Sequence, residues 1–284
     1  MREKKSSQFP PWIKRELGGG TKFNKTAKTL EDLGLETICT NAKCPNQGEC
    51  WSRGTSTVLI LGNICTRNCP FCAVGHGKPF PPDPDEPNKI AEMTRRLDVK
   101  YLVITSVDRD DLVDGGASQF RDVVLACRGR DGKMRFELLV PDFRDCQEEA
   151  LEILDSALPF VFGHNVETVL ELYKMARPGG DYKRTLALLR KAKIKWPDIP
   201  VKSSMMLGLG ETDEQVIAVL KDLREAGCDR VSLGQYLRPS KEALAVAEFV
   251  TPEKFDWWAE KAKELGFSWV MSSPFTRSSY HADE

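Results

Sequence analysis

The stretch Thr57-Val-Leu-Ile-Leu-Gly62, followed by Cys65-Thr-Arg-Asn-Cys69-Pro-Phe-Cys72, decides the fold of this chain. The first part is an apolar, partly β-branched run that predicts a buried strand. The second part places three cysteines at C-x3-C-x2-C spacing in the loop that follows. Three thiolates are one ligand short of a closed zinc site, and one short of the four that usually hold a cubane iron–sulfur cluster. One coordination position is therefore left open for another group, as in catalytic metal sites.

This strand and cysteine loop resemble the radical S-adenosylmethionine (SAM) family. The resemblance implies that Cys65, Cys69 and Cys72 hold a [4Fe–4S] cluster whose fourth iron binds the amino and carboxylate groups of SAM. It also implies reductive cleavage of the sulfonium and release of a 5′-deoxyadenosyl radical, which abstracts hydrogen from an unactivated C–H bond. Phe71, directly before the third cysteine, matches an aromatic residue that packs near the adenine. The alternatives are a structural zinc knuckle or ordinary buried cysteines.

A second cysteine triplet lies upstream, in Cys39-Thr-Asn-Ala-Lys-Cys44-Pro-Asn-Gln-Gly-Glu-Cys50. This C-x4-C-x5-C spacing is by itself compatible with zinc. His76 is the nearby candidate for a fourth zinc ligand, but it is closer in sequence to the other triplet. A binuclear zinc cluster of the fungal DNA-binding type does not fit the spacings, and a net charge of −1 disfavours such a module. We interpret the triplet as ligands of a second iron–sulfur cluster.

Composition sets the outer bounds. The 284 residues are 41% hydrophobic and 29% charged, which predicts a globular chain with core for one large domain plus extensions. No apolar stretch reaches the ~20 residues that span a membrane, and the charged start lacks the apolar region of a secretory signal. We expect a cytoplasmic protein with reduced thiols and no membrane or nucleic-acid partner.

Residues 1–78 carry 12 Lys and Arg against 6 Asp and Glu, so this basic end either steers an acidic partner or is a solvated face.

Strand-like and helix-like segments alternate after residue 55. Six short apolar runs predict strands at residues 57–61, 101–107, 136–140, 160–162, 201–207 and 230–236. Helical patterns separate them at about residues 86–98, 119–129, 146–157, 182–195 and 213–226. This alternation implies parallel pairing through right-handed crossovers. We predict an α/β fold, a partial (β/α)6 radical SAM barrel over residues 56–250, with an N-terminal extension over 1–55 and a C-terminal extension over 251–284.

Polar residues follow the predicted strands at the barrel end where catalytic groups gather. By resemblance, the segment after the second strand meets the methionyl ammonium group of SAM, although an acidic turn capping the next helix is the alternative. Polar groups after the fourth strand suit ribose hydroxyls and a carboxylate. The candidate SAM or substrate contacts are Thr105, Ser106, Asp108, Asn165 and Arg177. We expect His164 to be a structural histidine rather than a ligand.

The stretch Arg277-Ser-Ser-Tyr-His-Ala282 narrows the family. Together with the paired cysteine triplets and Gln235-Tyr-Leu-Arg-Pro239, it resembles the lipoyl synthase family over about residues 9–283. In that family a serine oxygen from this stretch is the fourth ligand of the auxiliary cluster, and the match favours Ser279 over Ser278. A hard alkoxide is a poor partner for soft iron–sulfide. Such a ligand is readily displaced, which suits a cluster that is consumed as a sulfur source.

The resemblance implies a sulfurtransferase that inserts two sulfur atoms, at carbons 6 and 8 of a protein-bound octanoyl-lysine chain, and spends two SAM molecules. The auxiliary [4Fe–4S] cluster, on Cys39, Cys44, Cys50 and Ser279, is then the sulfur donor. The implied partners are an octanoylated lipoyl carrier domain, from a 2-oxoacid dehydrogenase acyltransferase or the glycine-cleavage H protein, and an electron donor such as ferredoxin or flavodoxin. Two rivals stay open: a methylthiotransferase, which would bring an added nucleic-acid-binding domain, and a noncatalytic iron–sulfur or zinc protein.

Overall fold

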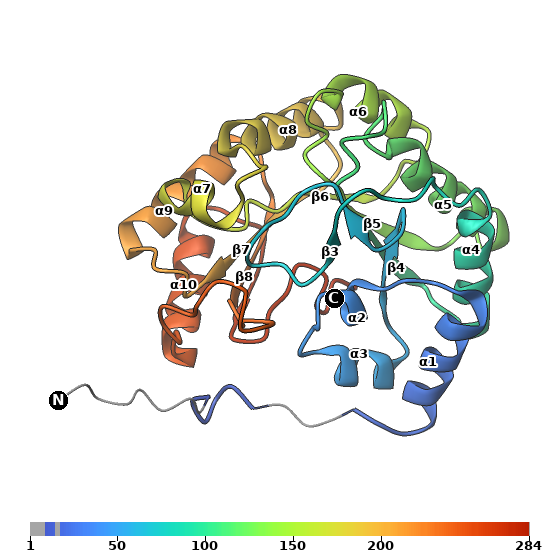
Figure 1. Ribbon diagram of the computed structural model, residues 1–284. Helices are drawn as coiled ribbons and strands as arrows, with labels where there is room; N and C mark the ends of the chain where they lie inside the picture. Colours follow the sequence, from blue (N-terminus) through green and yellow to red (C-terminus); the bar gives the residue numbers. More distant parts are fainter. Residues whose placement is uncertain (1–8, 15–17, 284) are drawn as a thin grey trace.

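A curved, fully parallel sheet organises the protein, which is described here by a computed structural model over residues 9–14 and 18–283. The strands follow one another in the sheet in their order along the chain, and they form an open arc with helices on the outside (Figure 1). The seven strands are β1 (Thr57–Ile60), β4 (Tyr101–Ser106), β5 (Arg135–Leu139), β6 (Val161–Gly163), β7 (Val201–Leu207), β8 (Arg230–Gln235) and β9 (Trp269–Ser273).

Helices cover the outer face of the arc and connect successive strands. They are α4 (Glu86–Leu97), α5 (Ala117–Arg130), α6 (Gln147–Asp155), α8 (Tyr182–Lys195), α9 (Asp213–Glu225) and α10 (Pro252–Glu264). Each presents apolar side chains to the sheet, and the capping box of Thr212 and Gln215 fixes the start of α9. Ile104, Phe120 and Phe162 are fully buried in the resulting core. The predicted α/β partial barrel is confirmed.

The sheet has one strand more than the six predicted. β9 pairs in parallel with β8, with Val270 opposite Val231 and Ser272 opposite Leu233. The C-terminal extension predicted over residues 251–284 includes this segment. In the structure α10 and β9 continue the alternation of helix and strand. The division of the chain at residues 55 and 250 stays a prediction.

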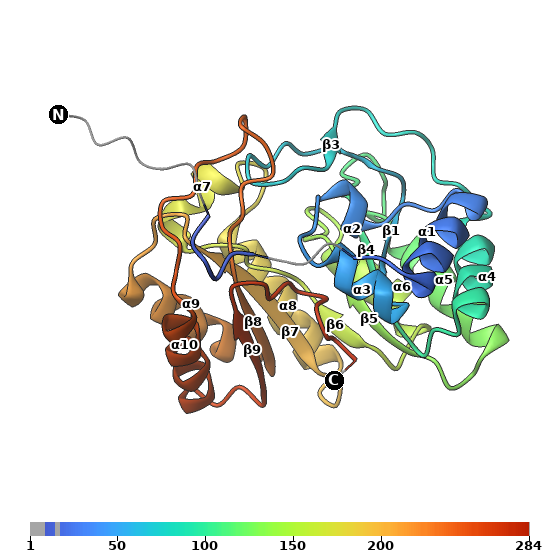
Figure 2. The same cartoon turned by 90° about the horizontal axis from the view of Figure 1, so that it is seen from below.

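The helices α2 (Ile38–Asn41) and α3 (Gln47–Arg53) lie at the open side of the arc together with the end of the described chain (Figures 1 and 2). The first helix, α1 (Thr21–Leu33), packs beside α4 at the flank of the arc and also contacts α3. Thr37 forms an antiparallel bridge with Val58, so α2 starts directly beside β1. The Asn46 side chain donates a 2.7 Å hydrogen bond to the carbonyl of Phe275 in the C-terminal tail, which we define as residues 274–283. Within the described ranges, no helix has the length and apolar character needed to cross a membrane.

Candidate active site

The C-x3-C-x2-C loop lies at the carboxyl end of β1. The chain leaves β1 through Gly62, whose φ of 84° suits glycine, and then forms the short strand β2 (Ile64–Cys65), which pairs with β3 (Gly75–His76). Within the loop, the Cys72 amide donates to the Cys69 carbonyl at 2.9 Å. The turn thus directs three sulfurs toward one cavity. It is a cavity of about 250 Å³, which we call the first cavity.

The first cavity gathers every SAM-related residue that the sequence predicts. Its lining includes Cys65, Cys69, Phe71, Cys72, Thr105, Ser106, Asp108, Asn165 and Arg177. These residues come from the cysteine loop and from the segments after β4 and β6, because the carboxyl ends of parallel strands share one edge of the sheet. Leu59, Leu139 and Val140 give the cavity an apolar wall. The arrangement can hold a ligand with both charged and apolar parts.

The three thiols of this loop fit a metal cluster. Burial raises the pKa of Cys65 to about 11 and that of Cys69 to about 12, and it also raises the pKa of Cys72. Thiols with such values stay protonated at neutral pH until a bound cation displaces the protons. Backbone amides already point at two of the sulfurs: Arg67 N lies 3.4 Å from Cys65 Sγ, and Val74 N lies 3.4 Å from Cys72 Sγ. These donors would stabilise thiolate ligands.

The three polar candidates after β4 differ in their contacts. The Thr105 hydroxyl donates to the Leu139 carbonyl at 3.0 Å, so it already joins β4 to β5. Asp108 forms an ion pair with Arg67 at 3.3 Å. Ser106 Oγ is buried and has no hydrogen-bond partner among the described residues. Because an unsatisfied buried hydroxyl is costly, Ser106 is suited to meet a polar group of a ligand in the first cavity.

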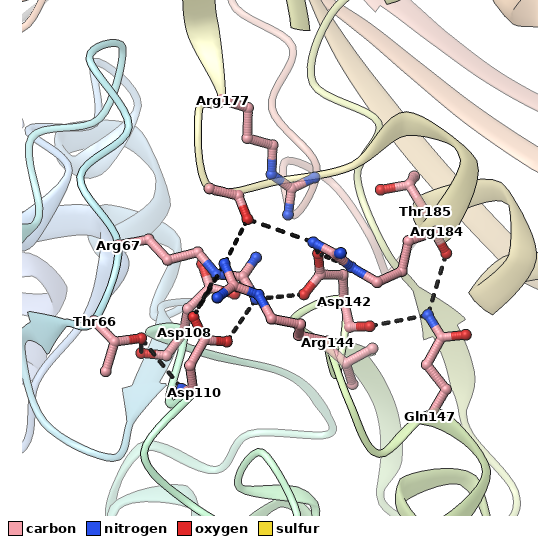
Figure 3. Close-up of polar contacts among 12 residues, drawn as sticks. Thr66, Arg67, Asp108, Asp110, Asp142, Arg144, Gln147, Arg177, Arg184 and Thr185 are labelled. Carbon is pink, nitrogen blue, oxygen red and sulfur yellow. Dashed lines mark hydrogen bonds and ion pairs between the residues drawn. The ribbon is translucent and has the colours of Figure 1, made fainter. Parts of the chain in front are cut away.

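Arg67, between the first two cysteines of the loop, has a role that sequence reasoning missed. Its side chain is only 3% exposed, and Nη2 lies 2.6 Å from both Asp110 and Asp142 (Figure 3). Arg184 also pairs with Asp142, at 2.8 Å. Burial acts to raise the pKa of Asp142, but the hydrogen bonds and charge of Arg67 outweigh it and hold this pKa well below its usual range. Arg67 therefore anchors the cysteine loop to the ends of β4 and β5.

Asp108, Asp110 and Asp142 lie close enough to one another to suggest a cation site. The guanidinium of Arg67 contacts all three carboxylates and supplies their counter-charge. We therefore interpret the cluster as a buried ion-pair network rather than a metal centre. The sequence does contain a signal for this network, namely an arginine inside the cysteine motif and acidic residues after two successive strands. That these groups meet, however, depends on the fold.

The segment after β6 supplies a second polar group. Asn165 Nδ2 donates to Glu167 Oε1 at 3.1 Å, and Arg177 Nη1 donates to the Asn165 carbonyl at 3.0 Å. Burial raises the pKa of Glu167, although Arg177 and the Asn165 amide oppose it. Glu167 also lines the first cavity and was not among the predicted contacts. Its place directly after a predicted strand is the signal in the sequence that points to it.

His164 is a structural histidine, as predicted. It is 1% exposed, and its Nδ1 lies 2.8 Å from the Val140 carbonyl, so Nδ1 carries a proton. Its Nε2 contacts the hydroxyl of Thr185 at 3.1 Å. Burial, and to a smaller extent the charge of Arg177, lowers the pKa of His164 to about 4. The side chain thus joins β6 to the end of β5 and to α8 as a neutral group.

Phe71 fixes the other side of the cysteine loop. Its ring packs against a small apolar cluster formed by Ala176, Leu209 and Tyr236. The preceding Pro70 carbonyl accepts a 3.0 Å hydrogen bond from the Leu244 amide. The loop is therefore held by an ion-pair network on one side and by apolar packing on the other.

The upstream cysteine triplet lines a second cavity, of about 220 Å³, between the N-terminal helices and the C-terminal tail. Cys39, Cys44, Cys50 and Ser279 all line it, whereas Ser278 is not part of its lining. Burial and the neighbouring Cys44 raise the pKa of Cys39 to about 11, and burial with both other sulfurs raises that of Cys50 to about 12. Three thiols and one hydroxyl in one cavity fit a metal cluster with a single oxygen ligand.

A cysteine loop of this spacing, at the carboxyl end of the first strand of an open parallel barrel, defines a radical SAM protein. The model of the radical SAM superfamily matches residues 59–223, and a [4Fe–4S] cluster and SAM are the cofactors of that class. The fold is similar to that of methylornithine synthase, with a TM-score of 0.55 and 14% identity, covering 93% of this chain and 86% of that one.

More specific matches follow from the sequence. The model of the N-terminal domain of lipoyl synthase matches residues 1–44. The chain is 50% identical to the lipoyl synthase of Thiobacillus denitrificans over 98% of this chain and 89% of that protein. It is likewise 50% identical to the lipoyl synthase of Methylococcus capsulatus, over 97% and 85%. The chain belongs to the lipoyl synthase family.

Proposed function

We propose that this protein inserts two sulfur atoms, at carbons 6 and 8 of an octanoyl-lysine chain on a carrier domain, and so forms the lipoyl group. The observation that carries the proposal is the presence of two separate cavities with three thiols each. One of them has polar groups for SAM, and the other has the hydroxyl of Ser279. A structural zinc or iron–sulfur protein has no need for a large cavity beside an incomplete set of ligands.

In the first cavity, Cys65, Cys69 and Cys72 would hold the catalytic cluster. When bound, that cluster supplies the electron that cleaves SAM. Ser106 Oγ offers an unsatisfied polar atom to the methionyl end, and Phe71 offers an apolar face to the adenine. Asn165, Glu167 and Arg177 place amide, carboxylate and guanidinium groups where ribose hydroxyls and a carboxylate would lie. Thr105 and Asp108 contribute by shaping this wall.

In the second cavity, Cys39, Cys44, Cys50 and Ser279 would hold a second [4Fe–4S] cluster. Serine oxygen is a harder ligand than thiolate, so it is the more easily displaced of the four from iron–sulfide. A cluster with one weak ligand is suited to be the donor of the inserted sulfur. The position of Ser279, rather than Ser278, in this cavity supports the choice between the two serines.

The two cavities are close enough to serve one alkyl chain. Val103 lines the second cavity and Thr105 lines the first, and residues two apart on a strand face the same side about 7 Å apart. Ile38 lines both cavities. With Leu59 and Leu139, these side chains give the inside of the arc an apolar surface. An octanoyl chain lying there would have its carbons between the two centres.

The partners follow from this substrate. The carrier would be an octanoylated lipoyl domain, either of a 2-oxoacid dehydrogenase acyltransferase or of the glycine-cleavage H protein. The electron donor would be a ferredoxin or a flavodoxin. A cytoplasmic location, expected from six clustered thiols, stays a prediction.

Anaerobic turnover with an octanoylated carrier peptide, SAM and a reductant tests the proposal. Mass spectrometry should show a lipoyl product together with 5′-deoxyadenosine and methionine. Cys39→Ala should still cleave SAM but form no carbon–sulfur bond, whereas Cys65→Ala should lose both activities. Equal loss of both activities in the two variants would contradict separate roles, and a wild-type protein that binds zinc and cleaves no SAM would favour the structural alternative.

A further inference from the structure

Adjacent serines of the C-terminal tail have different surroundings: one lines the second cavity, and the other contacts a residue that lines the first. Ser279 lines the second cavity with Cys39, Cys44 and Cys50. The hydroxyl of Ser278 instead donates a 3.0 Å hydrogen bond to Oδ1 of Asn165, which lines the first cavity. The two partners are 113 residues apart in sequence. One peptide unit and one hydrogen bond therefore connect the two cavities.

Two hydrogen bonds hold the side-chain amide of Asn165, and a third holds its backbone carbonyl. Its Nδ2 donates to Glu167 Oε1 at 3.1 Å, which leaves Oδ1 as the acceptor for Ser278. Its backbone carbonyl accepts from Arg177 at 3.0 Å. Rotation of the amide would place Oδ1 against the Glu167 carboxylate and lose that hydrogen bond, since two acceptors cannot pair, whereas the Ser278 hydroxyl could still accept from Nδ2. The position of the Ser278 hydroxyl therefore depends on the position of Asn165 and of its partners Glu167 and Arg177 beside the first cavity.

Backbone hydrogen bonds hold both ends of the connection, one end to the barrel and the other within a turn of the tail. The Glu167 amide donates to the Ser204 carbonyl at 3.1 Å, and the Met206 amide donates to the Glu167 carbonyl at 2.9 Å, so Glu167 is tied to β7. In the tail, the Tyr280 amide donates to the Arg277 carbonyl at 3.0 Å, which encloses both serines in one turn. A shift at Asn165 is therefore passed to Ser279 through a short turn rather than through a flexible loop.

We propose that Ser278 is a positioning residue that couples SAM binding in the first cavity to the placement of Ser279 in the second. The proposal rests on the proposed function, since it assumes that SAM and the serine-ligated cluster occupy these two cavities. With SAM bound, Asn165 and Glu167 are held in place and keep the turn of the tail in position. Without SAM, the polar group is less restrained and Ser279 is more easily displaced.

Amide hydrogen exchange of residues 275–283 tests the connection without any turnover. In the cluster-free protein, Ser278→Ala should speed exchange in this segment about fivefold, the factor expected for loss of one ordinary hydrogen bond. Asn165→Ala, which also removes the bond to Glu167, should speed exchange of this segment by the same factor, and the double variant should exceed neither single variant, because both break the same bond between Ser278 and Asn165. Ser268→Ala removes a serine bond to the Asp229 carbonyl at an exposed turn and should leave the tail unchanged.

The coupling itself is tested in the cluster-loaded protein. SAM should slow exchange of the tail in the wild type but not in Ser278→Ala. That variant should still cleave SAM, and it should form several-fold less lipoyl product per 5′-deoxyadenosine. Unchanged tail exchange in Ser278→Ala, additive effects in the double variant, or an unaltered response to SAM would overturn the proposal. A wild-type protein that cleaves SAM but forms no lipoyl product would overturn the proposed function instead, because the exchange of the cluster-free tail does not depend on it.

Discussion

The hydroxyl of Tyr280 donates a 2.8 Å hydrogen bond to Oε1 of Glu49, the residue directly before Cys50. The same oxygen lies 3.1 Å from Nε2 of His281. One carboxylate on α3 thus holds two consecutive side chains of the C-terminal tail. The residue that follows Ser279 is in this way attached to the helix that carries a cysteine of the second cavity.

Tyr280→Phe should weaken this attachment. Loss of the hydrogen bond should lower the free energy of unfolding of the cluster-free protein by about 1 kcal/mol in urea denaturation. It should also alter the electron paramagnetic resonance signal of the second cluster, because the serine oxygen is held less firmly. Tyr182→Phe is the matched control, since it removes a 2.7 Å bond to Asp222 on the outer helices. A similar change of the cluster signal in both variants would contradict a specific role for Tyr280.

Arg67→Gln should destabilise the protein strongly. The variant leaves Asp142, whose side chain is fully buried, with Arg184 as its remaining ion-pair partner. Loss of one partner from a buried network costs about 3 kcal/mol, measured as the free energy of unfolding in urea. Iron bound by the C-x3-C-x2-C loop should fall as well. Arg95→Gln, which removes an exposed pair with Glu92, should cost far less because solvent screens that pair, and an equal loss in the two variants would contradict the anchoring role.

His164 should make stability depend on pH. Its pKa is lowered from 6.5 to about 4 in the folded protein, so between these values the unfolded chain binds a proton that the folded chain does not. The stability that His164 contributes is therefore complete above about pH 6.5 and is lost as the pH falls toward 4, by about 3 kcal/mol in all. Urea denaturation at several pH values should show a shallower pH dependence for His164→Asn than for the wild type. Identical slopes would refute this assignment.

Local patterns were enough to predict most of the fold. The first six strands and the five helices between them were visible because apolar periodicity and cap signals lie within one segment each. β9 was missed as a strand of the sheet because its pairing with β8 joins Val231 to Val270, a relation that no local pattern contains. The spacing of the C-x3-C-x2-C triplet was a specific signal, whereas the upstream triplet could be interpreted only together with the other motifs.

The parts of the site that escaped prediction depend on convergence of distant segments. Arg67 meets acids from the ends of two other strands, and Glu49 meets side chains more than two hundred residues away. Such contacts depend on the curvature of the sheet and on the path of the tail. Neither can be predicted from the local pattern of residue types. Spacing predicted the ligand candidates, and the fold supplied the residues that hold them in place.

The lysines of α1 offer a test of carrier docking. Lys22, Lys25 and Lys28 are exposed and three residues apart, so they share one face of the helix. If the carrier is acidic, reversal of all three to glutamate should weaken its binding and reduce the salt dependence of the affinity. Lys221→Glu, on α9 at the opposite flank, should have little effect. If the triple variant binds the carrier with unchanged affinity and unchanged salt dependence, this face of α1 is not the docking site.

In the proposed function, the cluster held in the second cavity gives up its own sulfur. The most direct measurement loads the protein with clusters made from isotopically heavy sulfide and follows a single turnover with excess ordinary sulfide in solution. Both sulfur atoms in the lipoyl product should be heavy, and iron should be released from the cluster of the second cavity alone. A product that carries ordinary sulfur, with both centres intact after turnover, would contradict it.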